Sequence, residues 1–294
     1  MSAHTRIQKA YKSAKILPID KNSKLILMSD CHRGTGSGAD DFAKNQNIYN
    51  AALNHYYREG FTYIELGDGD ELWENRHFSM IAREYMHVFS LLGRFHKEGR
   101  LHMIYGNHDL DKKDPPWVAN NLENLFPGIK LSDGLVLRHE PSKQEMLLIH
   151  GHQADFFNYK MWRLARFLVR YLWQPLELVG VQNPFNSPRS PKRRHGVGRL
   201  LVKWSKQENK MLIAGHTHRT AFPNEGEPLY YNVGSTVHRR YITGIEIEND
   251  IFSLVKWSVQ PRDDNVLIIK REVVESGPVV VQFQKERIFA PKNT

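Results

Sequence analysis

The chain has 294 residues, which is long enough to bury a full hydrophobic core in one large domain or two small ones. Its single cysteine excludes an intramolecular disulfide, and this fits a reducing compartment, so we expect a cytoplasmic protein. The sequence has no apolar run of about 18 residues and no apolar stretch near its start that is typical of a signal peptide. Neither a membrane-spanning helix nor export is therefore expected.

The net charge of +9 is concentrated in one part of the chain. Residues 155–210 contain 12 lysines and arginines but only 3 aspartates and glutamates, and the charges of the remainder balance. The sequence thus describes a neutral body that carries one basic segment. Such a segment indicates an anionic partner, whether a substrate, a lipid surface or a nucleic acid.

The first part of the chain alternates predicted strands and helices. After a short basic helix and a loop over residues 1–23, three apolar runs predict buried strands, which cover residues 24–28, 61–66 and 101–105. Helices are predicted between them, over about 41–57 and 77–97. This alternation indicates a parallel sheet, and ligands of such sheets bind beyond the carboxyl ends of the strands.

The later part of the chain is rich in predicted strands. Residues 135–139 and 146–149 predict a hairpin, and residues 210–214 predict another buried strand. Four more strands are predicted from residue 229 onward, and they cover residues 230–233, 241–247, 251–259 and 266–271. The chain is therefore expected to be a mixed α/β protein.

Five short polar clusters follow these apolar runs, and each supplies Asp, Asn or His. They are Asp30-Cys31-His32, Gly67-Asp68, Gly106-Asn107-His108-Asp109, His150-Gly151-His152 and Gly215-His216-Thr217-His218. Any one of them alone is more often a turn or a satisfied histidine. Five at successive strand ends predict a single metal site that is assembled from many loops.

The ligand types suit a pair of divalent cations. A pair requires a bridging carboxylate and mixed nitrogen and oxygen ligands on both sides. Asp68 is the best bridge because a glycine precedes it, while Asp30 and His32 can turn toward one ion. Asn107 is a neutral oxygen ligand, and the nitrogen ligands are His150, His216 and His218.

The order D-x-H, G-D, G-N-H-D, H-G, G-H-T-H resembles the calcineurin-like metallophosphoesterase superfamily. The resemblance runs from about Leu25 to Ser235 and includes the Asn-Val-Gly-Ser sequence at its end. It implies an α/β fold, a four-layer αββα sandwich of two packed mixed sheets. It also implies two divalent ions, with Mn²⁺ expected first and Fe or Zn as alternatives.

The resemblance assigns a role to each residue of the clusters. One metal would be held by Asp30, His32, Asp68 and His218, and the other by Asp68, Asn107, His150 and His216. His108 would act as the general acid toward the leaving oxygen, and Asp109 would orient it.

Other residues of the clusters are less specific. Arg33 follows a metal ligand, so its planar fork can bind a phosphate oxygen, although a surface arginine beside a glycine-rich loop is an equal alternative. Cys31 is expected to pack as a small apolar residue. His152 fits either an outer contact of the metal site or a substrate contact.

Residues 155–210 are expected to form a basic helical lid inserted into a single domain that spans residues 1–294. From Asp155 to about Gly180, one helix face is apolar and the opposite face carries Lys160, Arg163, Arg166 and Arg170. A second helix is predicted over about 198–208. A solvated basic face is the simple interpretation. The scarcity of acidic neighbours favours instead an anionic substrate bound by Arg163, Arg166 and Arg170, or a dock on anionic lipid or nucleic acid.

Two stretches resemble one branch of the superfamily more closely, the UDP-diacylglucosamine diphosphatases. These are residues 67–73, Gly-Asp-Gly-Asp-Glu-Leu-Trp, and residues 215–219, Gly-His-Thr-His-Arg. That branch typically has Arg where His108 stands and H-G-D where this chain has His150-Gly151-His152. The resemblance implies a lipid-precursor diphosphatase at the inner membrane surface.

These observations lead to a ranked set of functions. The leading hypothesis is a dinuclear metal-dependent phosphoesterase in which a metal-activated hydroxide attacks an anionic phosphate-containing substrate and His108 is the general acid. The first alternative is the lipid-precursor diphosphatase, in peripheral contact with an anionic membrane. The second is a nuclease, or a non-catalytic nucleic-acid-binding protein that uses the basic segment. The sequence gives no indication of an oligomeric state.

Overall fold

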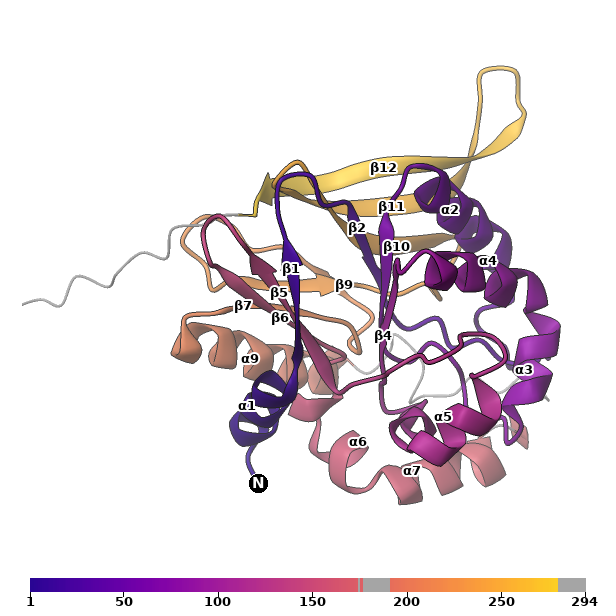
Figure 1. Cartoon of the computed structure of the whole chain (residues 1–294). Coiled ribbons are helices and arrows are strands. Elements are labelled where there is room, and N and C mark those ends of the chain that lie inside the picture. The colour runs from indigo at the N-terminus through magenta and orange to yellow at the C-terminus, as the bar shows by residue number, and fades with distance from the viewer. Residues whose placement is uncertain (174, 177–190, 280–294) are drawn as a thin grey trace, which may run out of the picture.

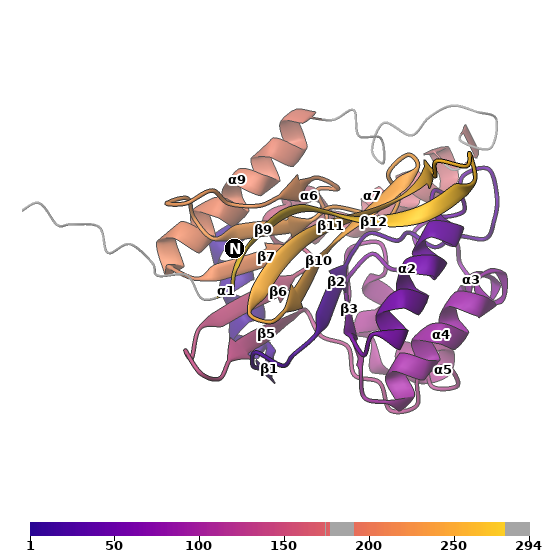
Figure 2. The same cartoon turned by 90° about the horizontal axis from the view of Figure 1, so that it is seen from above.

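The computed structural model describes residues 1–173, 175–176 and 191–279 (Figure 1). Two six-stranded mixed sheets pack face to face, and helices cover the outer face of each. Figure 2 shows these layers, with α2, α3 and α4 on one side of the sheets and α1 and α9 on the other. The predicted four-layer α/β sandwich is confirmed.

The first sheet has the strand order β12-β11-β10-β2-β3-β4. Its parallel half consists of β2 (Leu25–Met28), β3 (Thr62–Leu66) and β4 (Leu101–Ile104), as the alternation of strands and helices predicts. Its antiparallel half consists of β10 (Tyr241–Glu248), β11 (Ile251–Pro261) and β12 (Leu267–Pro278).

The second sheet has the strand order β1-β5-β6-β7-β9-β8. The predicted hairpin is present as β5 (Gly134–His139) and β6 (Glu145–Ile149), and β6 then pairs in parallel with β7 (Met211–Ala214). The other strands are β1 (Lys15–Ile19), β8 (Thr220–Ala221) and β9 (Tyr230–Val233). The segment of β1 was predicted as a loop. It is mostly exposed, so it lacks the apolar run on which a strand prediction depends.

Alternation along the strands separates the layers of the core. In β2, Leu25 and Leu27 face the second sheet, whereas Ile26 and Met28 face the helices. All four side chains are buried, because this strand lies inside a sheet that is covered on both faces. A continuous apolar run without visible alternation is the expected sequence of such a strand.

Helices α2 (Gln46–Arg58), α3 (Phe78–Glu84) and α4 (Met86–Lys97) cover the first sheet, together with the short α5 (Pro115–Asn121). The helix predicted over residues 77–97 is divided at Tyr85. The Tyr85 hydroxyl donates a 2.5 Å hydrogen bond to Asp40, which ties the break to the loop after β2.

The basic segment has two parts with different positions. Its first part is a series of short turns, α6 (Phe156–Lys160), α7 (Trp162–Leu168) and the π-helical turn η3 (Val169–Trp173). Its last part, α9 (Pro191–Glu208), packs with α1 (Ala3–Ser13) on the second sheet through Trp204 and belongs to the outer layer of the sandwich. The last part therefore packs on the body of the protein, whereas a lid over residues 155–210 stays a prediction, and the end of its first predicted helix, residues 177–180, lies outside the described residues. In the part of the chain that the structure describes, no helix has both the length and the apolar character needed to cross a membrane.

Candidate metal centre

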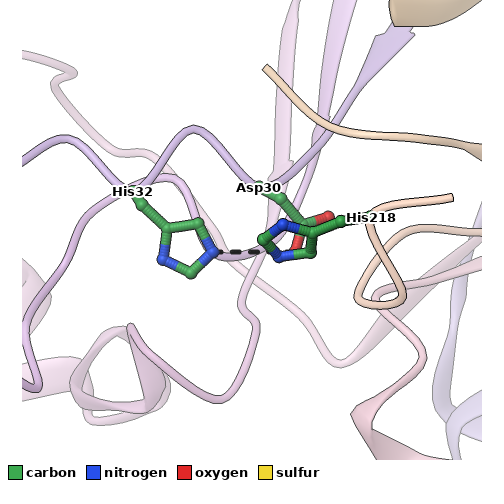
Figure 3. A group of neighbouring side chains, drawn as sticks. All are labelled: Asp30, His32 and His218. Atoms are coloured by element: carbon green, nitrogen blue, oxygen red, sulfur yellow. Dashed lines mark ion pairs between the residues drawn. The ribbon is translucent and has the colours of Figure 1, made fainter. Parts of the chain in front are cut away.

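Residues that follow four strand ends, those of β2, β3, β6 and β7, meet at one edge of the two sheets. Their ligand atoms form two groups, within which all atoms lie within 4.8 Å of one another. The first group is Asp30, His32 and His218 (Figure 3), and the second is Asp68, His150 and His216. The structure thus brings together six of the seven predicted ligands in the two sets that the family resemblance implies.

Asp68 lies between the two groups. Its Oδ2 is 3.0 Å from His150 Nε2 and 3.9 Å from His32 Nε2, so one oxygen faces both sides. Its Oδ1 accepts a 2.8 Å hydrogen bond from the backbone N–H of His108. This division of the two oxygens holds the loops after β3 and β4 together and leaves Oδ2 directed at the histidines.

Asp30 makes a similar connection between the two sheets. Its Oδ1 lies 3.0 Å from His218 Nε2, and its Oδ2 accepts a 2.9 Å hydrogen bond from the backbone N–H of His216. Figure 3 shows the His32 ring directed at this carboxylate, with the His218 ring overlapping it in the view. Because Asp30 follows β2 and His216 follows β7, one side chain joins the two halves of the sandwich at the site.

The backbone at the site is strained and closely packed. Five of the predicted ligands have left-handed φ values between 48° and 65°, namely Asp30, His32, Asp68, His216 and His218. Non-glycine residues rarely adopt this conformation, and where it occurs it clusters at functional sites. A Cβ added at Gly106 would lie 2.1 Å from Asp68 Oδ1, and one added at Gly67 would lie 2.7 Å from the Gly106 nitrogen.

The donor atoms fit divalent cations. Of the thirteen buried side-chain atoms that have no hydrogen-bond partner among the described residues, four are possible metal-binding atoms of predicted ligands, namely Asp30 Oδ1, His32 Nε2, Asn107 Oδ1 and His150 Nε2. Buried polar atoms are nearly always satisfied, so four that come from the predicted ligands indicate a shared ligand. Asn107 is fully buried and both of its side-chain polar atoms are unsatisfied, which suits the oxygen ligand expected of it.

Electrostatics at the site couple the carboxylates to the histidines. Burial by itself would raise the pKa of Asp68, but the histidines around it, His150 first, hold that pKa below its ordinary value. Burial by itself would lower the pKa of His150, but Asp68 and Asp30 raise it to about 9. The pKa of His32 is also raised, against its burial, by Asp30 and Glu71.

Glu71 links the candidate acid to a predicted metal ligand. Its carboxylate lies 2.7 Å from His32 Nδ1 and 2.8 Å from His108 Nδ1. Burial would raise the pKa of Glu71, but His108 and His32 lower it to about 2, so this carboxylate stays ionised. A carboxylate on Nδ1 leaves Nε2 of each ring directed away from it and available to another partner.

Asp109 does not have its predicted role of orienting His108. Its carboxylate accepts hydrogen bonds from the backbone N–H groups of Gly106 at 2.7 Å and Gly69 at 3.0 Å, and from Lys112 Nζ at 2.7 Å. It is fully buried beneath the loops that carry Asp68 and Asn107. Glu71 orients the His108 ring instead, and Asp109 shapes the backbone around the ligands.

Arg33 is not a phosphate ligand in this structure. It is fully buried, and its guanidinium donates to Asp70 at 2.7 Å and to both oxygens of Glu65 at 2.9 and 3.0 Å. The guanidinium carbon also lies over the face of Phe89, 5.1 Å from the ring centroid. The prediction of a catalytic Arg33 is therefore wrong, because the guanidinium is fully buried and its three nitrogens all donate to Asp70 or Glu65 inside the protein.

The insertion turns two of its arginines inward and its apolar residues outward. Arg166 pairs with Asp111 at 3.0 Å, and Arg170 donates to the backbone oxygens of Leu72 and Trp73. Of the three predicted substrate-binding arginines, only Arg163 is exposed. The apolar side chains that are 38% to 57% exposed on this segment are Phe156, Phe157, Leu164, Phe167, Leu168 and Leu172. A solvated basic face therefore describes only half of the predicted residues, since Lys160 and Arg163 are exposed while Arg166 and Arg170 bind the protein.

Two residues of the predicted clusters, His152 and Cys31, are in neither group of ligand atoms. His152 is buried and stacks on Tyr159, and burial together with His150 and His216 lowers its pKa well below the ordinary value. It therefore stays neutral and fits an outer contact. Cys31 is fully buried and packs with the helices of the first sheet, as expected of a small apolar residue.

Sequence reasoning gave no role at the site to Glu71 and Lys112, and it left Trp73 open between a wall of the site and a core residue. Glu71 was noted only as part of the resemblance to one branch. The available signal was the run of three acidic residues with one glycine at 68–71, which exceeds what a single bridging ligand needs. Nothing in the sequence shows which acidic side chain faces which histidine.

The burial of Arg33 generates a stability prediction. Arg33→Met leaves Glu65 without its bidentate partner and should destabilise the fold by about 3–5 kcal/mol, because a buried charge then lacks its partner. Urea unfolding followed by circular dichroism measures the change. Arg58→Met, which removes an exposed arginine at the end of α2, is the matched control and should change little. Equal stability of the two variants would contradict the structural role of Arg33.

The raised pKa values generate a prediction for metal binding. In the metal-free protein His150 and His32 hold protons that a metal must displace, so affinity should rise with pH through the range below about 9. The slope should approach tenfold per pH unit for each proton released. Calorimetry in two buffers of different ionisation enthalpy counts those protons. His87→Ala, at an exposed histidine of α4, should leave the slope unchanged. A pH-independent affinity would refute the linkage.

Comparison with known proteins connects this geometry to a family. The family profile described as calcineurin-like phosphoesterase matches residues 23–220. A search of curated proteins finds no match. Among solved structures, Chaetomium thermophilum Vps29 is 10% identical with a TM-score of 0.41, and the alignment covers 87% of this chain and 97% of that one. The same protein complexed with the RaPID-derived cyclic peptide RT-D3 gives a TM-score of 0.39 at 10% identity, with coverages of 88% and 98%. Since the family profile spans well over half of the chain, this protein belongs to the calcineurin-like phosphoesterase family.

Proposed function

We propose that this protein is a dinuclear metal-dependent phosphoesterase. The observation that carries the proposal is the position of Asp68 between two groups of ligand atoms, with His108 beside them. Two contacts of His108 support this role: its backbone N–H donates to Asp68, and its ring lies 4.7 Å from that of His32 between centroids.

Two divalent ions would be held by the predicted sets, with Asp68 common to both. Asp30, His32 and His218 complete one set, and Asn107, His150 and His216 complete the other. Ions bound there would offset the charge of a phosphoryl group and lower the pKa of a water molecule. Mixed nitrogen and oxygen ligands suit Mn, Fe or Zn.

The protein supplies the proton for the leaving group through His108. Glu71 stays ionised and lies on Nδ1, so it fixes the orientation of the His108 ring and leaves Nε2 to donate to a leaving oxygen. His108 is 7% exposed, so its ring is near the surface of the site rather than sealed in the core. The Trp73 indole stacks on the ring at 4.1 Å and excludes water from one of its faces.

The proposal predicts metal-dependent hydrolysis that depends on named residues. With added Mn²⁺, the protein should hydrolyse an aryl phosphate monoester or diester. Asp68→Ala and Asn107→Ala should abolish turnover, while His108→Ala should lower kcat by about 10²–10⁴-fold, the usual contribution of a general acid. A panel of monoester, diester and diphosphate substrates, each with Mn, Fe, Zn and Mg, identifies the reaction class. The diester arm includes nucleic acid and so tests a nuclease.

His87→Ala is the matched control, since it removes an exposed histidine remote from the ligand groups. It should retain full activity. Turnover that survives Asp68→Ala would rule out the proposed metal pair. Equal activity of His108→Ala and His87→Ala would remove His108 from the reaction.

A lipid-linked diphosphate is the second candidate substrate. The supporting observation is the apolar surface of α6, α7 and η3, with Lys160 and Arg163 exposed on the same segment. An interfacial helix carries this combination, because its apolar side enters the acyl region while its basic side chains meet anionic headgroups. Residues 67–73 also resemble the diphosphatase branch, although His108 stands where that branch has Arg.

This candidate predicts binding to anionic membranes. The protein should float with vesicles of phosphatidylcholine and phosphatidylglycerol, and less with phosphatidylcholine alone. Leu164→Ser combined with Phe167→Ser should reduce binding several-fold. Leu267→Ser combined with Val274→Ser, at side chains of β12 that are 70% and 52% exposed, removes apolar area elsewhere and is the control. Equal flotation of wild type and the Leu164 and Phe167 double variant, or none by either, would end support for a lipid substrate.

A further inference from the structure

The loop of residues 72–76 lies between the insertion and the candidate acid. On the acid side, the Trp73 ring stacks on His108 with 4.1 Å between centroids and 24° between planes. Glu71, directly before the loop, holds His108 Nδ1 at 2.8 Å. The edge and one face of the His108 ring are therefore set by two residues that are separated by one position, and both are buried.

On its other side the same loop is held by the insertion. Arg170 donates from Nε to the backbone oxygen of Trp73 at 2.8 Å and from a terminal nitrogen to that of Leu72 at 2.7 Å. Tyr171 hydrogen-bonds Arg76, whose guanidinium also lies over the Tyr171 ring, 5.5 Å from its centroid. The turn η3 thus forms hydrogen bonds with both ends of the loop, at residues 72–73 and at residue 76.

A second contact of the insertion reaches the loop that carries His108 itself. Arg166 lies 3.0 Å from both oxygens of Asp111, three residues after His108. The segment from Asp109 to Lys112 is anchored on its inner side by the buried pair of Lys112 with Asp109 at 2.7 Å. The insertion is therefore attached to both loops that determine where the His108 ring lies.

Arg170 is chemically suited to hold a backbone and not a substrate. Its fork bonds two successive carbonyl oxygens, a bidentate arrangement that a flexible ammonium group cannot reproduce. Charge-assisted bonds of this kind are roughly twice as strong as neutral ones. Since these bonds occupy Nε and a terminal nitrogen, the predicted contact of Arg170 with an anionic substrate is not what this geometry supports.

We propose that Arg170 is a positioning residue for His108. By fixing the backbone at Leu72 and Trp73, it holds the Trp73 indole against the His108 ring and keeps Glu71 on Nδ1, so that Nε2 stays aligned with the leaving oxygen. The insertion thereby acts on proton transfer and not only on access to the site. The proposal rests on the proposed phosphoesterase function and adds a residue outside the ligand groups to it.

Leaving-group dependence tests this role. An aryl phosphate releases a stable phenolate and needs little protonation, whereas an alkyl phosphate releases an alkoxide that depends on the acid. Arg170→Met should lower kcat for the alkyl ester about tenfold and leave the aryl ester within about twofold, a smaller version of the selective loss in His108→Ala. Arg170→Lys should be intermediate, because it keeps the charge and can reach one carbonyl.

Arg199→Met is the matched control. It removes the same charge from an exposed position on α9, away from the loop, and should change neither substrate. Metal content of each variant is measured alongside, and the Arg170 variants should retain that of wild type. An equal loss on both esters, or no loss on either, would show that Arg170 has only a structural role or none and would overturn the proposal.

Failure of the proposed function has a different signature. If wild type hydrolyses neither ester with any of the four metals, the phosphoesterase proposal fails, and hydrogen–deuterium exchange decides the role of Arg170 on its own. The amides of Leu72, Trp73 and Asn75 are hydrogen-bonded within the loop. Exchange that is several-fold faster in Arg170→Met than in Arg199→Met supports the hold on the loop. Unchanged exchange overturns it.

Discussion

The site depends on how the two oxygens of Asp68 are divided. Oδ1 is used by the backbone of His108, so Oδ2 remains for the histidines of both ligand groups. A carboxylate this deeply buried is stable only where neighbouring groups favour its charge, and His150 is foremost among them. Below it, Asp109 holds the backbone of the same loops and is in turn neutralised by Lys112. The ligands, the candidate acid and the buried network are therefore one connected arrangement.

The strands and the ligand positions were predictable because both leave a local signal. A strand covered on both faces is a largely apolar run in the sequence, and a cluster of Asp, Asn or His directly after it is easily recognised. β2, β3, β4, β6 and β7 follow this rule, and so do the clusters after them. β1 does not, since most of its residues are exposed and its pairing with β5 comes from the fold and not from its composition.

The partners of the charged residues were not predictable from the chain. Arg33 and Asp109 stand beside ligands in sequence, yet their side chains point into a buried network, while Glu71 is the one that reaches His108. Backbone direction after a strand end decides this, and five left-handed residues at the site make it irregular. For the insertion, the periodicity predicted one apolar and one basic face. It did not show which of these side chains contact the rest of the protein. Those contacts are made by Arg166 with Asp111 and by Arg170 with two backbone carbonyl oxygens. The position of a backbone carbonyl cannot be read from the sequence.

Two glycines, Gly67 and Gly106, set how closely the loops at the site can approach one another. Gly106 is pressed against Asp68 Oδ1 and Gly67 against the backbone of Gly106, so a methyl group at either position would force the ends of β3 and β4 apart. These two residues therefore act as spacers that set the separation of the ligand-bearing loops. Substituting a ligand removes one donor and leaves the frame intact, whereas substituting a spacer displaces several donors together. Because a Cβ at Gly106 would also lie 2.5 Å from the Asp68 backbone nitrogen, and one at Gly67 would meet the backbone of Gly106, both spacers are required by the backbone itself, whichever side chains the neighbouring loops carry.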